Sequence, residues 1–255
     1  MVRQQGLPSG GRESSRATKK DEGRRALGIG VLALLTSAKG QHDAYKRSAA
    51  ALIHKVALLY QSNLLNRYVL FIPERSEPIE TFYSARNFQH LCGYDYRRRI
   101  SPEVFFEQAL ANTLSDASLV AKYVRNTRAK MRILPTIMHI DTKASTLIRN
   151  PVLPGLIRAD AVCIHVDALI GYRNTGAQMV PCTALQMNGM IAGQEVIIGV
   201  VKTEPTESSY TIYSKRVKAQ DPKGAIRRKR ILAALKRISD SRNVSSSLLS
   251  MVQEL

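Results

Sequence analysis

The hydrophobic pattern of this chain changes from helical spacing in its first half to short β-branched runs in its second half. Between Gln41 and Asn66 apolar side chains recur every three or four residues, which predicts a helix. Runs rich in Val, Ile, Tyr and Thr predict strands at 161–166, 179–187, 195–202 and 210–217. Helices followed by an antiparallel sheet indicate an α+β fold.

The first half also contains two strand-like runs between its helices. The run 68–72 stops at a proline, and 81–86 follows it after a polar loop. Ser101-Pro102-Glu103 is a strong helix start, because it combines a capping hydroxyl, a proline and a carboxylate in the first turn. A further helix is expected from Ser115 to Lys130. The pattern from 131 to 154 leaves the secondary structure open, since a proline interrupts it.

Composition excludes several classes of protein. Hydrophobic residues make up 44% of the 255, enough to bury a core, so disorder throughout is excluded. The longest apolar run, 27–35, is far shorter than the roughly 20 residues of a membrane-spanning helix. The cysteines, Cys92, Cys163 and Cys182, are too few and too scattered for a disulfide framework. We therefore expect a cytoplasmic protein with no membrane partner.

We expect one folded domain with a basic segment at each end. Residues 1–40 form the first segment, which is rich in Gly, Ser, Arg and Lys at its start and is predicted to be largely disordered. The α+β domain covers 41–217, and a basic helical tail covers 218–255.

Positive charge is concentrated near the C-terminus. The net charge is +18, and residues 215–242 hold 11 basic but only 2 acidic side chains. Asp221-Pro222 resembles a helix start, and the helix that follows carries Arg227, Arg228, Lys229 and Arg230. This pattern predicts phosphate contacts with nucleic acid. It also fits a surface helix that docks through its apolar stripe and leaves its charges in water.

The sequence lacks the usual nucleotide and metal signatures. It has no phosphate-binding glycine loop, no Cys-x-x-Cys and no His-Glu-x-x-His, and its acidic residues are scattered. We therefore expect neither a metal nor a cofactor. Metal-free RNA cleavage needs a base, an acid and cations around the phosphate. Of the five histidines, His90 stands out, because it lies in a glycine-bounded turn after a predicted strand. The alternative is that His90 caps this turn with a hydrogen bond to the backbone.

Three motifs, in order, resemble the phage- and mobile-element-associated nucleases of the barnase/EndoU/colicin/RelE-like group. The first is Asn87-Phe88-Gln89-His90-Leu91-Cys92-Gly93. The second is Leu169–Tyr172 followed by Val180–Leu185, with its proline and small hydroxyl. The third is the hairpin of Glu195–Lys202 and Tyr210–Tyr213. The resemblance covers roughly residues 68–217.

The resemblance implies helices packed on a curved antiparallel sheet and metal-independent cleavage of RNA by a toxin or mobile-element effector. His90 would be the acid or base, Lys202 would stabilise phosphate charge, and Thr183 and Tyr210 would orient the phosphate or share proton transfer. Arg86 is added from its charge and its proximity to His90. Besides RNA, an acidic antitoxin or immunity protein is an expected partner. The alternative is a non-catalytic nucleic-acid-binding protein that uses the basic C-terminal helix.

Overall fold

The computed structural model describes residues 48–122, 124–153, 157–176, 178–187, 189, 191–215, 222–239 and 243–254. The chain divides into two units, Met1–Ser48 and Ala49–Leu255, and the second contains every described helix and strand. The predicted disorder of residues 1–40 and the first turns of the helix expected from Gln41 lie outside the described residues.

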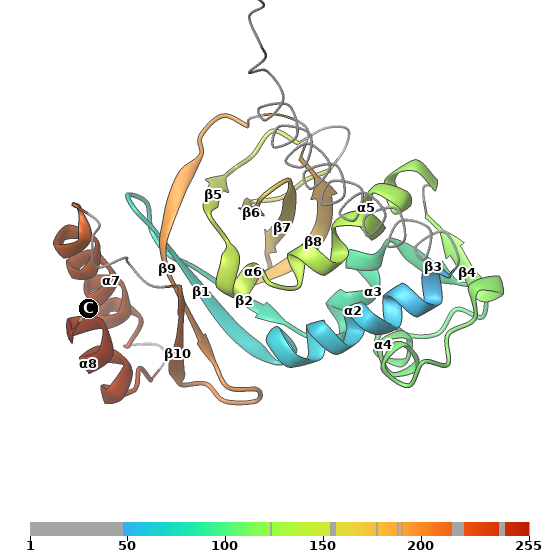
Figure 1. The fold of residues 1–255 in the computed structure, drawn as a ribbon, viewed down its shortest axis with the longest axis horizontal. Coiled ribbons are helices and arrows are strands. Elements are labelled where there is room, and N and C mark those ends of the chain that lie inside the picture. The colour runs from blue at the N-terminus through green and yellow to red at the C-terminus, as the bar shows by residue number, and fades with distance from the viewer. Residues whose placement is uncertain are drawn as a thin grey trace, which may run out of the picture. The chain divides into compact units, whose positions relative to one another are not determined.

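The second unit combines one large sheet with helices on its outside (Figure 1). Its helices are α2 (Ala49–Asn63), α3 (Ala85–Cys92), α4 (Pro102–Leu110), α5 (Val124–Ile137), α6 (Ile140–Lys143), α7 (Gly224–Ile238) and α8 (Ser246–Glu254). Its strands are β1 (Arg67–Pro73), β2 (Ile79–Tyr83), β3 (Tyr94–Tyr96), β4 (Leu119–Ala121), β5 (Thr146–Arg149), β6 (Ala161–His165), β7 (Ala168–Asn174), β8 (Met179–Gln186), β9 (Glu195–Thr203) and β10 (Tyr210–Lys215). The predicted α+β fold is confirmed.

The large sheet curves until it meets itself. Its strand order is β1-β2-β8-β7-β6-β5-β9-β10, and β9 also pairs with β1, which closes the ring seen in Figure 1. Strand β9 can join three neighbours because its first residues pair with β5 and its later ones with β10, while β1 lies along its other side. Among the described strands of this sheet, the pairings are antiparallel except that of β2 with β8, a single parallel pair between Thr81 and Met179. That pair joins two antiparallel hairpins, β1–β2 and β7–β8.

Several predicted elements are confirmed. Residues Ile53, Val56 and Tyr60 of α2 are fully buried, as the helical stripe predicted. Ser101 caps α4, because its hydroxyl accepts a hydrogen bond from the Val104 backbone N–H at 3.2 Å. The four strands expected in the second half are β6, β8, β9 and β10, although residues 216–217 lie outside the described residues.

Other expectations were wrong at their boundaries. The helix expected from Ser115 is a short 3₁₀ turn and strand β4, and α5 begins only at Val124. The segment 131–154 contains the end of α5, then α6 and β5. Pro135 lies inside α5, which ends only two residues later, so the proline removes one hydrogen bond without breaking the helix earlier.

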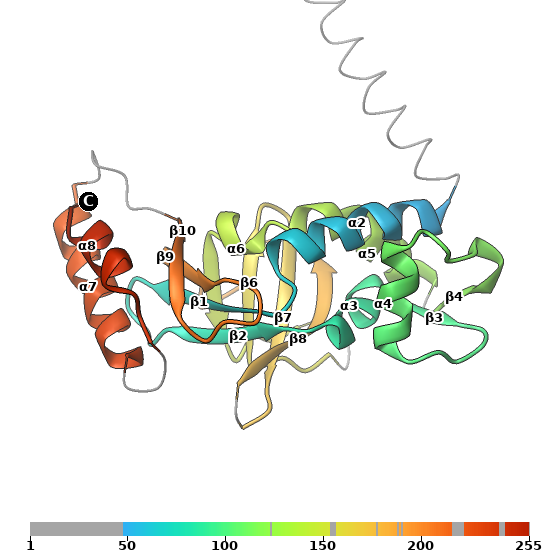
Figure 2. The same ribbon diagram turned by 90° about the horizontal axis from the view of Figure 1, so that it is seen from below.

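The basic C-terminal segment packs against the sheet. Apolar residues of α7 and α8, including Ile231, Leu235 and Leu248, form one core cluster with Val201 and Tyr210. Figures 1 and 2 place α7 and α8 at one end of this unit and α3, β3 and β4 at the other. Helix α7 begins at Gly224 with Lys223 as its N-cap; Asp221, the cap that we expected, is outside the described residues. Among the described helices, none has the length and apolarity needed to cross a membrane.

Candidate active site

His90 lies in the last turn of helix α3, not at the end of a strand as the sequence indicated. The helix forms because Phe88, Leu91 and Cys92 recur at helical spacing and bury one face. The opposite face carries His90, which is exposed. The helix ends at Gly93, whose φ of 75° is a left-handed conformation that favours glycine.

A pocket of about 460 Å³ opens beside His90, between α3, α5 and β8. Its wall from α3 contains Arg86, Asn87 and His90. The remaining lining residues are Gly93, Lys122, Asn126, Thr127, Lys130, Ile157, Arg158, Arg173, Val180, Pro181, Cys182, Thr183 and Leu185. The pocket therefore brings together His90, Arg86 and Thr183, three of the five residues predicted to be catalytic.

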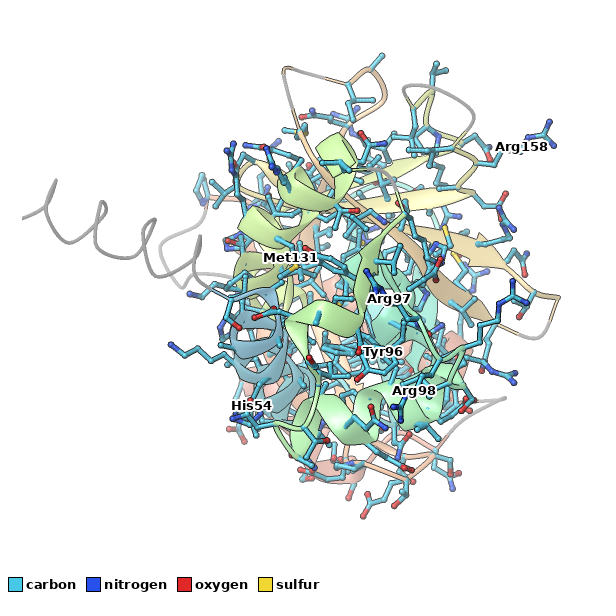
Figure 3. The ribbon with its side chains drawn as sticks, turned by 90° about the vertical axis from the view of Figure 1, so that its right-hand side faces the viewer. His54, Tyr96, Arg97, Arg98, Met131 and Arg158 are labelled. Carbon is cyan, nitrogen blue, oxygen red and sulfur yellow. The ribbon has the colours of Figure 1, made fainter. Side chains whose placement is uncertain are left out.

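The pocket is strongly cationic. Arg86, Lys122, Lys130, Arg158 and Arg173 line it together with His90, and among its described lining residues there is no Asp or Glu. Two of the cations are ion-paired from outside: Arg86 Nε lies 3.1 Å from Glu103 Oε1, and Lys122 Nζ lies 3.1 Å from Asp95 Oδ1. Arg158 projects from the side of the molecule drawn in Figure 3. Such a pocket favours a polyanion such as a nucleic-acid backbone.

The surroundings of His90 lower its pKa. Partial burial of the ring contributes most, and the positive charges of Lys130 and Lys122 add to it, while a hydrogen bond with the backbone of Cys182 acts in the opposite direction. The pKa of Lys130 is also lowered, first by burial. Its ammonium lies 3.4 Å from the His90 backbone carbonyl oxygen. At pH 7 the imidazole is therefore mainly neutral, and it has a cation beside it.

Strand β8 forms the floor of the pocket. Thr183 is buried there, and its methyl group packs against Gly171, where an added Cβ would come within 2.7 Å of it. Asn87 ties α3 to this strand, because its amide donates to the Pro181 carbonyl at 3.4 Å. Burial raises the pKa of the Cys182 thiol, so this cysteine stays protonated and does not resemble a thiolate nucleophile.

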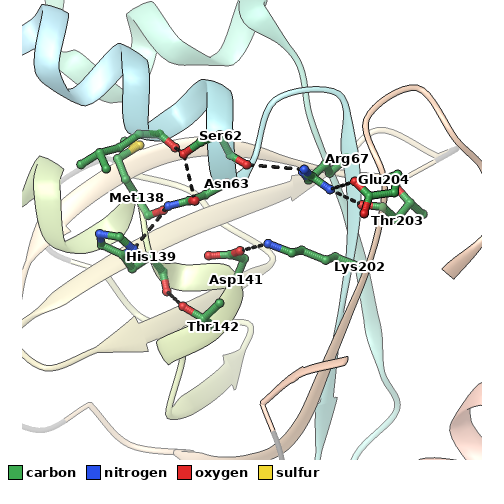
Figure 4. Close-up of polar contacts among 11 residues, drawn as sticks. Ser62, Asn63, Arg67, Met138, His139, Asp141, Thr142, Lys202, Thr203 and Glu204 are labelled. Atoms are coloured by element: carbon green, nitrogen blue, oxygen red, sulfur yellow. Dashed lines mark hydrogen bonds and ion pairs between the residues drawn. The ribbon is translucent and has the colours of Figure 1, made fainter. Parts of the chain in front are cut away.

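Lys202 and Tyr210 do not line this pocket. The Lys202 ammonium is buried and lies 2.5 Å from Asp141 Oδ2 on α6, as Figure 4 shows. The Tyr210 side chain is fully buried, and its hydroxyl donates to Glu80 Oε1 at 2.6 Å. The lysine beside His90 is Lys130.

The cations predicted on α7 are partly engaged within the protein. Arg227 forms an ion pair with Glu74 at 3.0 Å. The Arg230 guanidinium donates to the backbone carbonyls of Pro73 and Ser76, at 3.0 and 2.7 Å. Lys229 is exposed, and Arg228 is half-buried. These contacts hold α7 against the β1–β2 loop.

The family model described as phage-Barnase-EndoU-ColicinE5/D-RelE like nuclease4 (PBECR4) matches residues 52–230. The chain belongs to this nuclease family. The resemblance found in the sequence is thereby confirmed, and the matched range of the PBECR4 chain contains every residue that lines the pocket. No curated protein and no solved structure matches the chain.

Within the described part of this PBECR4 protein, no three or more His, Cys, Asp or Glu side chains gather where they could hold a metal ion. The pocket chemistry available from the chain is instead that of an imidazole, lysines, arginines and a threonine hydroxyl.

Sequence reasoning did not find Lys130, Lys122, Arg158 or Arg173. Lys130 is 40 residues from His90 in the chain, and only the packing of α5 against α3 brings them together. One signal was present: four basic residues lie among the nine from Val124 to Arg132, at the start of a helix.

Gly93 leaves room for the Lys130 side chain, and a Cβ at this position would push that side chain aside. We expect Gly93→Ala to destabilise the protein by about 1–2 kcal/mol, because a left-handed Ala is strained and its Cβ would lie 2.9 Å from Lys130 Cδ. Gly176→Ala is the matched control, since Gly176 also has a positive φ (88°) but nothing within 4 Å. Urea denaturation measures both; equal losses of stability would show that the contact with Lys130 does not matter.

Proposed function

We propose that this PBECR4 protein is an endoribonuclease that cleaves RNA without a metal ion. One observation carries the proposal: the His90 imidazole lines a pocket with five lysine and arginine side chains. A phosphodiester bound there would have a proton acceptor and cations on adjacent walls. The family supports a nuclease, and this choice of side chains supports RNA, because its 2′-hydroxyl supplies the nucleophile that DNA lacks.

In this mechanism neutral His90 takes the proton from the ribose 2′-hydroxyl. The 2′-oxygen attacks phosphorus, the bond from phosphorus to the 5′-oxygen breaks, and a 2′,3′-cyclic phosphate forms. Lys130 protonates the departing 5′-oxygen, since a lowered pKa makes its ammonium a readier acid. Arg86 and the rim arginines hold the negative phosphorane, and the Thr183 hydroxyl orients a phosphate oxygen. The roles of Lys202 and Tyr210 remain predictions from the resemblance.

Cleavage assays on the full chain test the proposal. We expect a single-stranded RNA to be cut in the presence of EDTA and to yield 2′,3′-cyclic phosphate and 5′-hydroxyl ends. A DNA strand of the same sequence with one ribonucleotide should be cut only after that ribonucleotide. A requirement for added Mg²⁺, or equal cleavage of all-deoxy DNA, would contradict the mechanism.

The alternative, a non-catalytic protein that binds nucleic acid through α7, needs a different test from truncation. Because Ile231 and Leu235 belong to a core cluster, removing α7 would expose the sheet. Lys229→Gln leaves this packing intact, since the side chain is exposed. Under the alternative this variant binds RNA more weakly than the wild type does. The RNA then stays uncleaved with the wild-type protein and with every variant of His90.

A further inference from the structure

Strands β3 and β4 form a small two-stranded sheet that extends directly from the pocket, although helix α4 separates the two strands in the chain. Tyr94 pairs with Ala121 and Tyr96 with Leu119. Its base is held by a hydrogen bond from the Lys122 N–H to the Gly93 carbonyl at 3.2 Å, and both of these residues line the pocket. This two-stranded sheet therefore begins at the edge of the cationic pocket.

Three consecutive arginines, Arg97, Arg98 and Arg99, follow β3. All three are exposed, and Arg97 and Arg98 are seen in Figure 3. Their backbone is fixed: the Arg97 N–H donates to the Ser118 carbonyl at 2.9 Å, and the Arg99 N–H to the Tyr96 carbonyl at 2.9 Å. Arg99 also has a φ of 46°, a conformation that is uncommon for a residue other than glycine. A tight, held turn thus presents three guanidinium groups to solvent.

These arginines differ in their charge partners from two arginines of α7, Arg227 and Arg237. Within the described ranges, none of the three is in an ion pair. The nearest carboxylate in the chain, Asp95, is engaged by Lys122. Arg227 and Arg237 of α7, in contrast, pair with Glu74 and Glu77. Among the described residues, the arginine turn after β3 therefore adds positive charge without a carboxylate partner to that of Arg158 and Arg173 in the pocket.

We propose that the arginine turn after β3 binds the backbone of single-stranded RNA beside the bond that is cleaved, an inference that rests on the proposed function. From Gly93 to Arg97 the chain covers four residues, or about 13 Å of extended strand. At this separation the arginines are within reach of nucleotides next to the one whose phosphate would lie at His90. Tyr96 makes a T-shaped contact with Phe105, with ring centroids 6.5 Å apart, so part of its ring is covered within the protein. Contacts by arginine to phosphate give binding that tolerates any sequence.

The test replaces the three arginines together, as Arg97→Gln/Arg98→Gln/Arg99→Gln. The control, Lys55→Gln/Lys143→Gln/Lys236→Gln, removes the same charge at exposed lysines of α2, α6 and α7. Binding is measured in the His90→Ala background, so that the RNA stays intact, with a 12-nucleotide single strand. We expect the arginine variant to bind about tenfold more weakly at low salt. The slope of log K against log salt should fall by about 2, or roughly 0.7 for each phosphate that the variant no longer neutralises.

Cleavage provides the second measurement. For each protein, kcat/KM on the 12-nucleotide RNA is divided by kcat/KM on a dinucleotide. For the arginine variant this ratio should fall about tenfold, because the dinucleotide is too short to reach the arginine turn. The control should change neither the ratio nor the slope by more than a small amount. An unchanged slope, or equal effects of the two triple variants, would overturn the proposal. If the wild-type protein cleaves no RNA, the proposed function fails. The binding measurement still decides whether the arginine turn binds RNA.

Discussion

Replacing His90 with Ala should lower the rate of RNA cleavage by about 10²–10⁴-fold, the usual contribution of a general base. Because His90 is exposed and lies in the last turn of α3, the variant should fold normally. His54→Ala is the matched control: its ring nitrogen contacts the Ala109 carbonyl at 2.9 Å, and it does not line the pocket. Single-turnover cleavage with EDTA present measures both variants, and circular dichroism checks the fold. Retention of activity by His90→Ala would remove the central residue of the mechanism.

The pH profile of cleavage tests whether His90 acts in its neutral form. A general base acts in its neutral form, so kcat/KM should fall tenfold for each pH unit below the pKa of His90. Burial and the charges of Lys130 and Lys122 lower that pKa, so the fall should begin below the ordinary value of about 6.5. Lys122→Met removes one of these charges and leaves the proposed acid, Lys130, in place, so it should move the limb to higher pH. If His90 were instead the acid, activity would decline as the pH rises through the same pKa.

The sequence contained enough information for the fold class and for part of the site. Short β-branched runs identified β6, β8, β9 and β10, because local patterning is strong in buried strands. Helix α3 was mistaken for the end of a strand, since eight residues give a weak periodic signal, although Phe88 and Leu91 lie three apart. Thr183 and His90 were both selected, and the structure places them at one pocket.

Partners distant in sequence were not predictable. Lys130 reaches His90 only because α5 packs on α3, and no local pattern contains that information. The same limit applies to the arginines of α7. A basic amphipathic helix looks identical in sequence whether its charges face water or an acidic loop, and here Glu74 and Glu77 of the β1–β2 loop accept two of them. Charge density thus predicted where cations are, but not which of them remain available to a ligand.

Lys202 is the clearest example of a partner that the sequence did not predict. It was predicted to be catalytic, and the structure pairs it with a buried carboxylate. Its partner, Asp141, is completely buried, and one carboxylate oxygen, Oδ1, has no hydrogen-bond partner among the described residues. Burial raises the pKa of Asp141, while the ammonium of Lys202 opposes that rise. The pair therefore depends on Lys202 to keep a buried carboxylate charged.

We expect Lys202→Met to destabilise the protein by about 3–5 kcal/mol at pH 7, since it leaves a buried charge without a partner. The raised pKa of Asp141 sets the sign of the pH dependence. A carboxyl that binds protons more tightly when folded favours the folded state as the pH falls, so the deficit should shrink between pH 7 and pH 5. Urea denaturation at both pH values measures this. A deficit that grows on acidification would mean that Asp141 is not the group left unpaired.

The double variant Asp141→Leu/Lys202→Met separates the structural role of the lysine from a catalytic one. Replacing both members of a buried pair with apolar residues is often neutral or stabilising, so most of the lost stability should return. Because neither residue lines the pocket, we expect the refolded double variant to cleave RNA within a few-fold of the wild-type rate. A stable double variant without activity would instead place Lys202 at the phosphate, as the resemblance implies, and would require the reacting RNA to reach the Lys202–Asp141 pair from the pocket that contains His90.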